Sequence, residues 1–245
     1  MGNVIRVLLC ATALSVASAH LAPAADLPTK APAYATAPSY NWTGFYVGGQ
    51  VGGGWDSNQV TTVNANMHFP AGYSHAASHG SGFLGGGYAG FNYQIGQFVF
   101  GIDGDYSWAK LIGSEADVSP FTGVVNHDTE RVKWITTLTG RLGYAVDNWL
   151  FFGKGGAAWA GFVGNGGTPT VGTNFSSTTR DGWTLGAGVE WGFAAHWSAK
   201  LEYDYVNFGT SKYNRTTTSG TSPPILPFSA TSSLNMVKLG LAYRF

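Results

Sequence analysis

The chain has 245 residues, and its 13 basic and 13 acidic side chains give a formal charge of zero. This balance excludes the basic footprint of a nucleic-acid-binding protein, and no acidic tail is present. Charged residues make up 11% of the chain, about half the roughly 25% usual in globular domains, while glycine (36 residues) and aromatics (15%) are abundant. No segment reaches the ~20 apolar residues that a membrane helix needs.

The N-terminus carries an apolar run from Val7 to Ala19 behind the single charge of Arg6. The run has the length of a signal-peptide core and is short for a membrane anchor. Small residues permit cleavage after Ala19 or Ala24, and we favour Ala24, which predicts a signal peptide over 1–24. Cys10 is the only cysteine and lies inside this segment. The mature chain therefore has no disulfide, thiolate metal site or cysteine nucleophile.

Residues 25–41 are expected to form an N-terminal linker on the periplasmic side, because 30–40 are rich in Pro, Ala and Thr. Eight strands are predicted beyond it, at 44–55, 81–93, 97–109, 132–145, 149–162, 182–193, 197–209 and 233–245. The connections alternate between about three residues and about twenty or more, which predicts antiparallel hairpins with every long loop at one end. An even strand number places both ends of this domain, 42–245, at the opposite, periplasmic end.

The predicted strands alternate with a period of two between an aromatic or aliphatic face and a polar face. In 97–109, for example, one face carries Phe98, Phe100, Ile102, Tyr106 and Trp108, and the other carries Val99, Gly101, Asp103, Asp105 and Ser107. Large aromatics also gather near both strand ends. A water-soluble barrel would be apolar inside and polar outside, whereas two aromatic girdles are typical of a barrel in a membrane. The predicted fold is all-β: an eight-stranded antiparallel up-and-down transmembrane β-barrel.

The polar face would line the lumen. It carries five acids and four bases: Asp103, Asp105, Arg141, Lys154, Glu190, Lys200, Glu202, Asp204 and Lys238. Neighbouring carboxylates such as Asp103 and Asp105 could perform acid–base chemistry. An eight-stranded barrel, however, is only wide enough for side chains to fill, and buried charges must pair. We therefore favour a structural network of ion pairs over catalysis.

Two further patterns are weak. Residues 85–90 match the dinucleotide-binding spacing GxGxxG, but no helix follows to bind a phosphate, so the glycines are better explained by tight strand curvature. The first long loop contains His68, His75 and His79, which could hold a transition metal or haem iron. Three incidental loop histidines are the favoured interpretation. We expect no cofactor.

Five segments together resemble the small outer-membrane β-barrel proteins of alphaproteobacteria, called porin-family or outer-membrane immunogenic proteins, which share the barrel of the OmpA transmembrane domain. The segments are 41–55, 98–108, 139–160, 197–209 and 237–245 (VKLGLAYRF). The resemblance implies location in the outer membrane of a Gram-negative cell, in contact with its lipid and lipopolysaccharide. It also implies that the assembly machinery recognises Tyr243 and the terminal Phe245.

The expected function is structural: a surface antigen that supports envelope integrity and presents long extracellular loops. A narrow porin for small solutes, or a surface binding module for haem or a host molecule, is the alternative. An enzyme acting on lipid is not expected, because no histidine lies within a predicted strand to serve as a base at the outer rim. Any extracellular ligand is left open, and nucleic acid is not expected as a partner.

Overall fold

The structure is a computed structural model that describes residues 40–64, 70–75, 78–118, 120–121, 123, 125–167, 174–216 and 225–245. The predicted signal peptide over 1–24, most of the predicted linker and His68 lie outside the described residues. Tyr40, at the end of the predicted linker, packs into the barrel and is buried. The barrel assembly therefore starts a little earlier than the sequence indicated.

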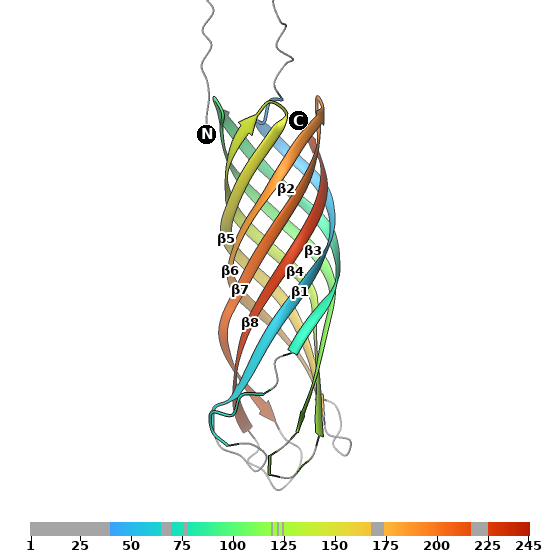
Figure 1. Cartoon of the computed structure of the whole chain (residues 1–245), viewed down its shortest axis with the longest axis vertical. Coiled ribbons are helices and arrows are strands. Elements are labelled where there is room, and N and C mark those ends of the chain that lie inside the picture. Colours follow the sequence, from blue (N-terminus) through green and yellow to red (C-terminus); the bar gives the residue numbers. More distant parts are fainter. Residues whose placement is uncertain are drawn as a thin grey trace, which may run out of the picture. The chain divides into compact units, whose positions relative to one another are not determined.

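Eight strands form one closed antiparallel barrel in sequence order (Figure 1). They are β1 (Gly44–Thr62), β2 (Ser78–Ile95), β3 (Phe98–Val118), β4 (Val125–Val146), β5 (Trp149–Gly167), β6 (Asn174–Ala194), β7 (Trp197–Thr216) and β8 (Ile225–Arg244). β8 closes the barrel by pairing antiparallel with β1. The predicted fold class is confirmed. No helix in the described ranges is long and apolar enough to cross a membrane.

The short turns, at the end of the barrel that we assign to the periplasm, are even tighter than predicted. Two residues each separate β2 from β3, β4 from β5 and β6 from β7. Gly96 and Asp147 open the first two of these turns with positive φ angles of 61° and 51°. A left-handed residue at this position matches the twist of the flanking strands, and Asp tolerates it better than most side chains. These turns and the C-terminus lie together at the upper end of Figure 1.

The opposite strand ends reach well beyond the predicted boundaries. β3 continues to Val118 and β4 begins at Val125, where the sequence suggested a loop of about twenty residues. The outer segments are rich in Ser, Thr, Asn and Gly and have no lipid-facing apolar period, so they resemble loops in sequence. The backbone ladder nevertheless continues through them, because β3 pairs with β4 as far as Val118 and Val125, and β7 pairs with β8 as far as Thr216 and Ile225. His79 and His127 consequently lie in β2 and β4, and the prediction of histidine-free strands was wrong.

The lipid-facing side of the barrel is the predicted one. Large apolar side chains protrude from every strand, with Phe83 84% and Trp108 67% exposed. Aromatics also pair across strands near both ends: Tyr106 stacks on Trp134 in the outer half, and Trp149 stacks on Trp191 in the periplasmic half. An exposed apolar belt between two aromatic girdles matches the hydrocarbon core of a membrane, whereas in water such a surface would promote aggregation.

Glycines on the inner face make room for the side chains that fill the lumen. A Cβ on Gly188 would lie 2.6 Å from the Phe152 ring, and one on Gly186 would lie 2.0 Å from a carboxylate oxygen of Asp204. No real Cβ tolerates such distances. The glycine content noted in the sequence therefore serves the packing of the barrel interior as well as strand curvature.

Candidate functional site: the filled lumen

The lumen is occupied by four layers of side chains that follow one another along the strands. From the periplasmic end outward they are an aromatic and arginine layer, a layer of lysines and carboxylates, an apolar layer, and an outer polar layer. β7 passes through three of them, with Ser198 in the first, Lys200 to Asp204 in the second, and Val206 and Phe208 in the third. Inward residues stand two apart on a strand, so each layer draws its members from several strands.

In the second layer, lysines and carboxylates are fully withdrawn from solvent. Lys238 Nζ lies 2.6 Å from Asp204 Oδ2, 3.1 Å from Glu202 Oε1 and 3.4 Å from Asp105 Oδ2. Lys154 Nζ shares the Glu202 oxygen at 2.8 Å and also lies 3.2 Å from Asp204 Oδ1. The paired charges compensate the desolvation that each would suffer alone.

Neutral donors and an aromatic ring complete this layer. The Tyr46 hydroxyl donates to Asp103 Oδ2 at 2.7 Å, and the Thr137 hydroxyl donates to Asp105. The Lys200 ammonium lies 3.6 Å from the centre of the Tyr88 ring. Because ring faces and hydroxyls fill the remaining directions around the ions, the layer is a packed polar core.

Glu190 organises the periplasmic layer. Its carboxylate accepts hydrogen bonds from Arg141, from Ser198 Oγ at 2.6 Å and from Arg244 Nη2 at 3.4 Å. The Arg141 guanidinium also lies 3.7 Å from the centre of the Phe152 ring. Two arginines on one carboxylate leave a positive excess in this layer, which the acid-rich second layer can offset.

The segment before β1 closes the periplasmic mouth. Trp42 is 0% exposed, and its ring centroid lies 4.5 Å from that of Tyr40. The backbone N–H of Trp42 donates to Gln94 Oε1 at 2.9 Å, and its carbonyl oxygen accepts a hydrogen bond from Arg244 Nη1 at 2.7 Å. A Cβ on Gly192 would lie 2.2 Å from the Tyr40 ring, so the glycine provides the space for this ring. We call Tyr40 to Trp42 the aromatic stopper.

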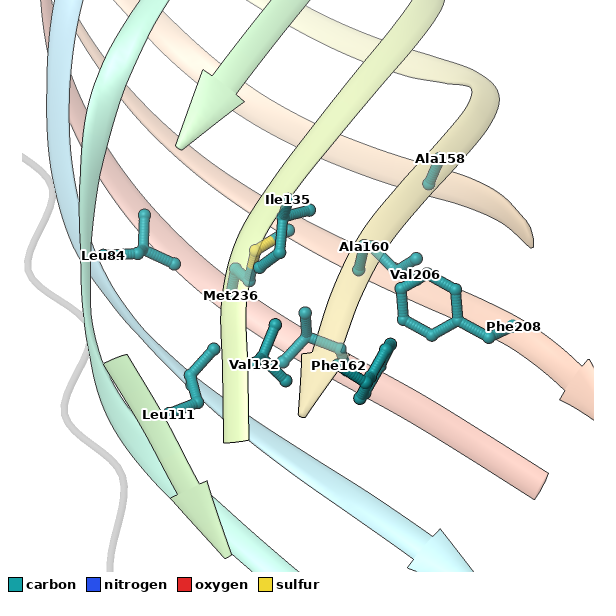
Figure 2. Packing of buried hydrophobic residues seen from close by; sticks show 11 residues of the cluster. Leu84, Leu111, Val132, Ile135, Ala158, Ala160, Phe162, Val206, Phe208 and Met236 are labelled. Atoms are coloured by element: carbon teal, nitrogen blue, oxygen red, sulfur yellow. The ribbon is translucent and has the colours of Figure 1, made fainter. Parts of the chain in front are cut away.

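An apolar layer, drawn in Figure 2, follows the charged one toward the outer ends of the strands. It consists of Leu84, Leu111, Val132, Ile135, Ala158, Ala160, Phe162, Val206, Phe208, Leu234 and Met236. Figure 2 shows these side chains directed from several strands toward the same interior space. The rings of Phe162 and Phe208 meet edge to face with centroids 5.3 Å apart. An apolar layer separates the buried ions from the extracellular water.

The outermost layer is polar again. Arg180 on β6 donates to Glu130 Oε1 and to Ser232 Oγ, both at 2.6 Å, and its guanidinium lies 4.1 Å from the Phe162 ring centre. The Asn58 amide donates to Glu130 Oε2 at 2.8 Å. This arginine therefore covers the apolar layer from the outside while its charge is met by a carboxylate.

All nine charged residues that the sequence placed in the lumen are buried there. Sequence reasoning missed a tenth, Arg244, which brings the bases of the inner two layers to five and balances the five acids. It also missed the aromatic stopper and the apolar layer. The alternation of β7 contained a signal for the latter, because Val206 and Phe208 continue the face that carries Lys200 and Asp204.

The two candidate metal ligands that the structure describes, His75 and His79, have different surroundings. His75 Nε2 lies 2.8 Å from Thr62 Oγ1, and its ring meets Tyr73 edge to face. His79 is exposed on β2, opposite Ser57, and His68 is outside the described residues. Within the part of the chain that the structure covers, no group of three or more His, Cys, Asp or Glu side chains could hold a metal ion.

A closed antiparallel barrel with a lipid-facing belt and a filled lumen defines the class of small outer-membrane β-barrels. The chain matches the family model described as outer membrane protein beta-barrel domain over residues 8–245, and it belongs to this family. It is an outer-membrane protein, as are its named relatives.

Two curated relatives are similar over most of their length. A 31 kDa outer-membrane immunogenic protein of Brucella melitensis is 27% identical and covers 98% of both chains. A 22 kDa outer membrane protein of Rhizobium leguminosarum bv. viciae is 30% identical, over 85% of this chain and 80% of its own. Among solved structures, the outer membrane protein OprG from Pseudomonas aeruginosa has a TM-score of 0.50 at 10% identity, covering 84% of this chain and 99% of OprG. That likeness shows the fold alone.

Proposed function

We propose that this protein is a structural component of the outer membrane: a sealed barrel that supports envelope integrity and presents its outer strand ends and loops at the cell surface. One observation carries the proposal, namely that the lumen is packed by successive layers of side chains from the aromatic stopper to Arg180. A protein that passes solutes needs a continuous aqueous path, and eight strands leave little room for one.

The porin alternative would require several layers to open together. The ion-pair layer and the apolar layer lie in series along the lumen, so a solute that passed one would still meet the other. Loss of the ion-pair layer would also leave charges unpaired at low dielectric. A surface binding module for haem or a host molecule has no supporting geometry among the described histidines. Relatives named outer-membrane proteins, rather than enzymes, favour a role without catalysis.

A deletion strain tests the proposal. We expect loss of the gene to increase leakage of a periplasmic reporter enzyme and sensitivity to bile-salt detergent, with unchanged uptake of a small hydrophilic β-lactam. Complementation with the intact gene should restore the barrier. A gene carrying Lys238→Met, which removes a buried charge of the lumen, is the matched negative control and should not restore it. Reduced β-lactam uptake with an intact barrier would instead support the porin alternative.

Assembly in the outer membrane is a second part of the proposal. Tyr243 and Phe245 would serve as the signal read by the assembly machinery, as the family resemblance implies. Phe245 is 73% exposed at the end of the chain, and its ring lies 5.2 Å from that of Tyr243. Deletion of Phe245 should lower surface abundance in cells while leaving refolding into detergent nearly unchanged. Equal abundance in cells would contradict this role.

A further inference from the structure

Cationic side chains are distributed very unevenly over the barrel. Six are buried in the lumen: Arg141, Lys154, Arg180, Lys200, Lys238 and Arg244. The remaining cations of the barrel whose side chains the structure describes are Lys110, Arg131 and Lys133, and all three are exposed. They lie on the neighbouring strands β3 and β4, where Leu111 pairs with Val132 and Ile112 with Arg131. We call these three residues the basic cluster.

A β-bulge in β4 creates the cluster. Ile135 and Val132 are both buried in the apolar layer although they are three residues apart, and relative to β5 the strand contains one extra residue between Val132 and Trp134. In a regular strand the inward alternation from Ile135 would continue to Lys133 and Arg131. The bulge reverses the alternation: Val132 turns inward, and Lys133 and Arg131 become exposed. Bulges re-aim side chains in this way at the rims of barrels.

The cluster lies directly beyond the lipid-facing belt. Trp108 pairs with Trp134 in the outer aromatic girdle, and Lys110 and Lys133 follow these residues on the extracellular side. On β2, the residue paired with Lys110 is Phe83, which is 84% exposed. Girdle aromatics lie at the headgroup level, and lysine stems can cross apolar surface to reach it. The ammonium and guanidinium groups are therefore placed where lipid headgroups begin.

No described side chain of the barrel neutralises the cluster. None of the three side chains makes an ion pair or a side-chain hydrogen bond with any part of the chain that the structure describes. The described carboxylates of β3 and β4 serve the lumen: Asp103 and Asp105 are buried, and Glu130 binds Arg180. Like charges side by side on adjacent strands repel one another. An external anion would relieve that repulsion, and arginine offers phosphate a bidentate contact.

We propose that Lys110, Arg131 and Lys133 form a binding site for the phosphate groups of an anionic glycolipid in the outer leaflet. The site gives the lipid contact that the family resemblance implies a specific location on the barrel wall. It rests on the outer-membrane location and the bulge in β4, and it is independent of whether the lumen is sealed. A membrane lipid is the source of phosphate because the cations adjoin the apolar belt and not the loop tips.

The test compares three forms of the mature barrel: wild type, the neutral triple variant K110Q/R131Q/K133Q, and the charge-conserving variant K110R/R131K/K133R. Each is reconstituted in phosphatidylcholine nanodiscs containing a small fraction of diphosphorylated lipid A or of the same lipid after enzymatic dephosphorylation. The readout is glycolipid retained per barrel after mild detergent extraction. Circular dichroism and gel mobility before and after boiling verify folding, and all three changes are on the exposed face.

A cation near an anionic surface contributes about fivefold in affinity, so three contribute about a hundredfold. We expect wild type and the charge-conserving variant to retain diphosphorylated lipid A at least about tenfold better than the dephosphorylated form. The neutral variant should retain both equally. If wild type and the neutral variant prefer diphosphorylated over dephosphorylated lipid A by the same factor, the proposed site is wrong. Release of lipid A by 10 mM inorganic phosphate, at constant ionic strength, would overturn the assignment to lipid in favour of free phosphate.

Discussion

Arg244 and Trp42 connect the last strand of the barrel with the segment before its first strand: the guanidinium Nη1 of Arg244 donates to the carbonyl oxygen of Trp42 at 2.7 Å. The same guanidinium lies 5.3 Å from the Trp42 ring and contacts Glu190 at 3.4 Å. The penultimate residue of the chain therefore holds the aromatic stopper against the charged lumen. Closure of β8 on β1 and closure of the periplasmic mouth are linked through one side chain.

Arg244→Gln should loosen the stopper and destabilise the barrel. The Trp42 carbonyl would lose a charged donor, while Glu190 would keep Arg141 and Ser198, so we expect a loss of about 1.5–3 kcal/mol in the free energy of unfolding. Urea titration in lipid vesicles measures this loss. Asp181→Asn is the control, since Asp181 is an exposed charge on β6, and its removal should change stability by less than about 0.5 kcal/mol. Equal losses of unfolding free energy in the two variants would contradict the role of Arg244 in holding the aromatic stopper.

Lys238→Met should be among the most damaging single changes in the lumen. Lys238 is 0% exposed and contacts Asp105, Glu202 and Asp204. Removing one partner of a buried ion pair costs about 3–5 kcal/mol, because the remaining charges are left without compensation. Adding Asp204→Asn removes one uncompensated carboxylate and should recover part of the loss. A double variant less stable than the single one would argue against mutual compensation.

Leu239→Arg and Ser233→Arg compare two depths on the outer face of β8. Leu239 is 59% exposed within the apolar belt, whereas Ser233 lies further out, paired with Asn207. An arginine costs about 2–4 kcal/mol near the midplane of a bilayer and about 0–1 kcal/mol near its interface. Refolding titrations into phosphatidylcholine vesicles should therefore show a clearly larger loss of stability for Leu239→Arg than for Ser233→Arg. Similar losses would mean that the membrane slab is misplaced along the strands.

Gly192→Ala should displace the aromatic stopper. The new Cβ would lie 2.2 Å from the Tyr40 ring, so the ring must move, and overpacking of this kind costs about 1–3 kcal/mol. A spin label on Asn41→Cys should become more mobile. Gly87→Ala is the matched control, because its Cβ would lie 3.5 Å from the nearest atom, the carbonyl oxygen of Gly48. An unchanged label spectrum in the Gly192 variant would show that the stopper does not depend on this contact.

Much of the fold was predictable because a barrel repeats one simple pattern. The period of two in β3 and β7 separates Phe100 from Asp103 and Leu201 from Lys200, and it defines the lipid and lumen faces without any long-range information. The outer strand ends were not predictable. Their polar residues face water on the outside, and only pairing with neighbours distinguishes them from loops.

The filled lumen was predictable only in part. Nine of its charges follow from alternation, but which of them meet depends on the register between strands far apart in sequence, such as Lys154 with Glu202. The bulge near Lys133 reverses the alternation in β4, so a strictly periodic interpretation would place Arg131 inside the barrel. The stopper lies outside any strand, and Trp42 therefore carried no periodic signal.

Electrical recording across a planar bilayer tests the sealed lumen most directly. Purified, refolded protein should insert without measurable single-channel current in 1 M KCl, because the ion-pair layer and the apolar layer both block the path. A variant that truncates the apolar layer and breaks the ion pairs, Phe208→Gly with Met236→Gly and Lys238→Gly, is the positive control for detecting a leak. Stable, uniform conductance steps from the unmodified, correctly folded protein would contradict the account.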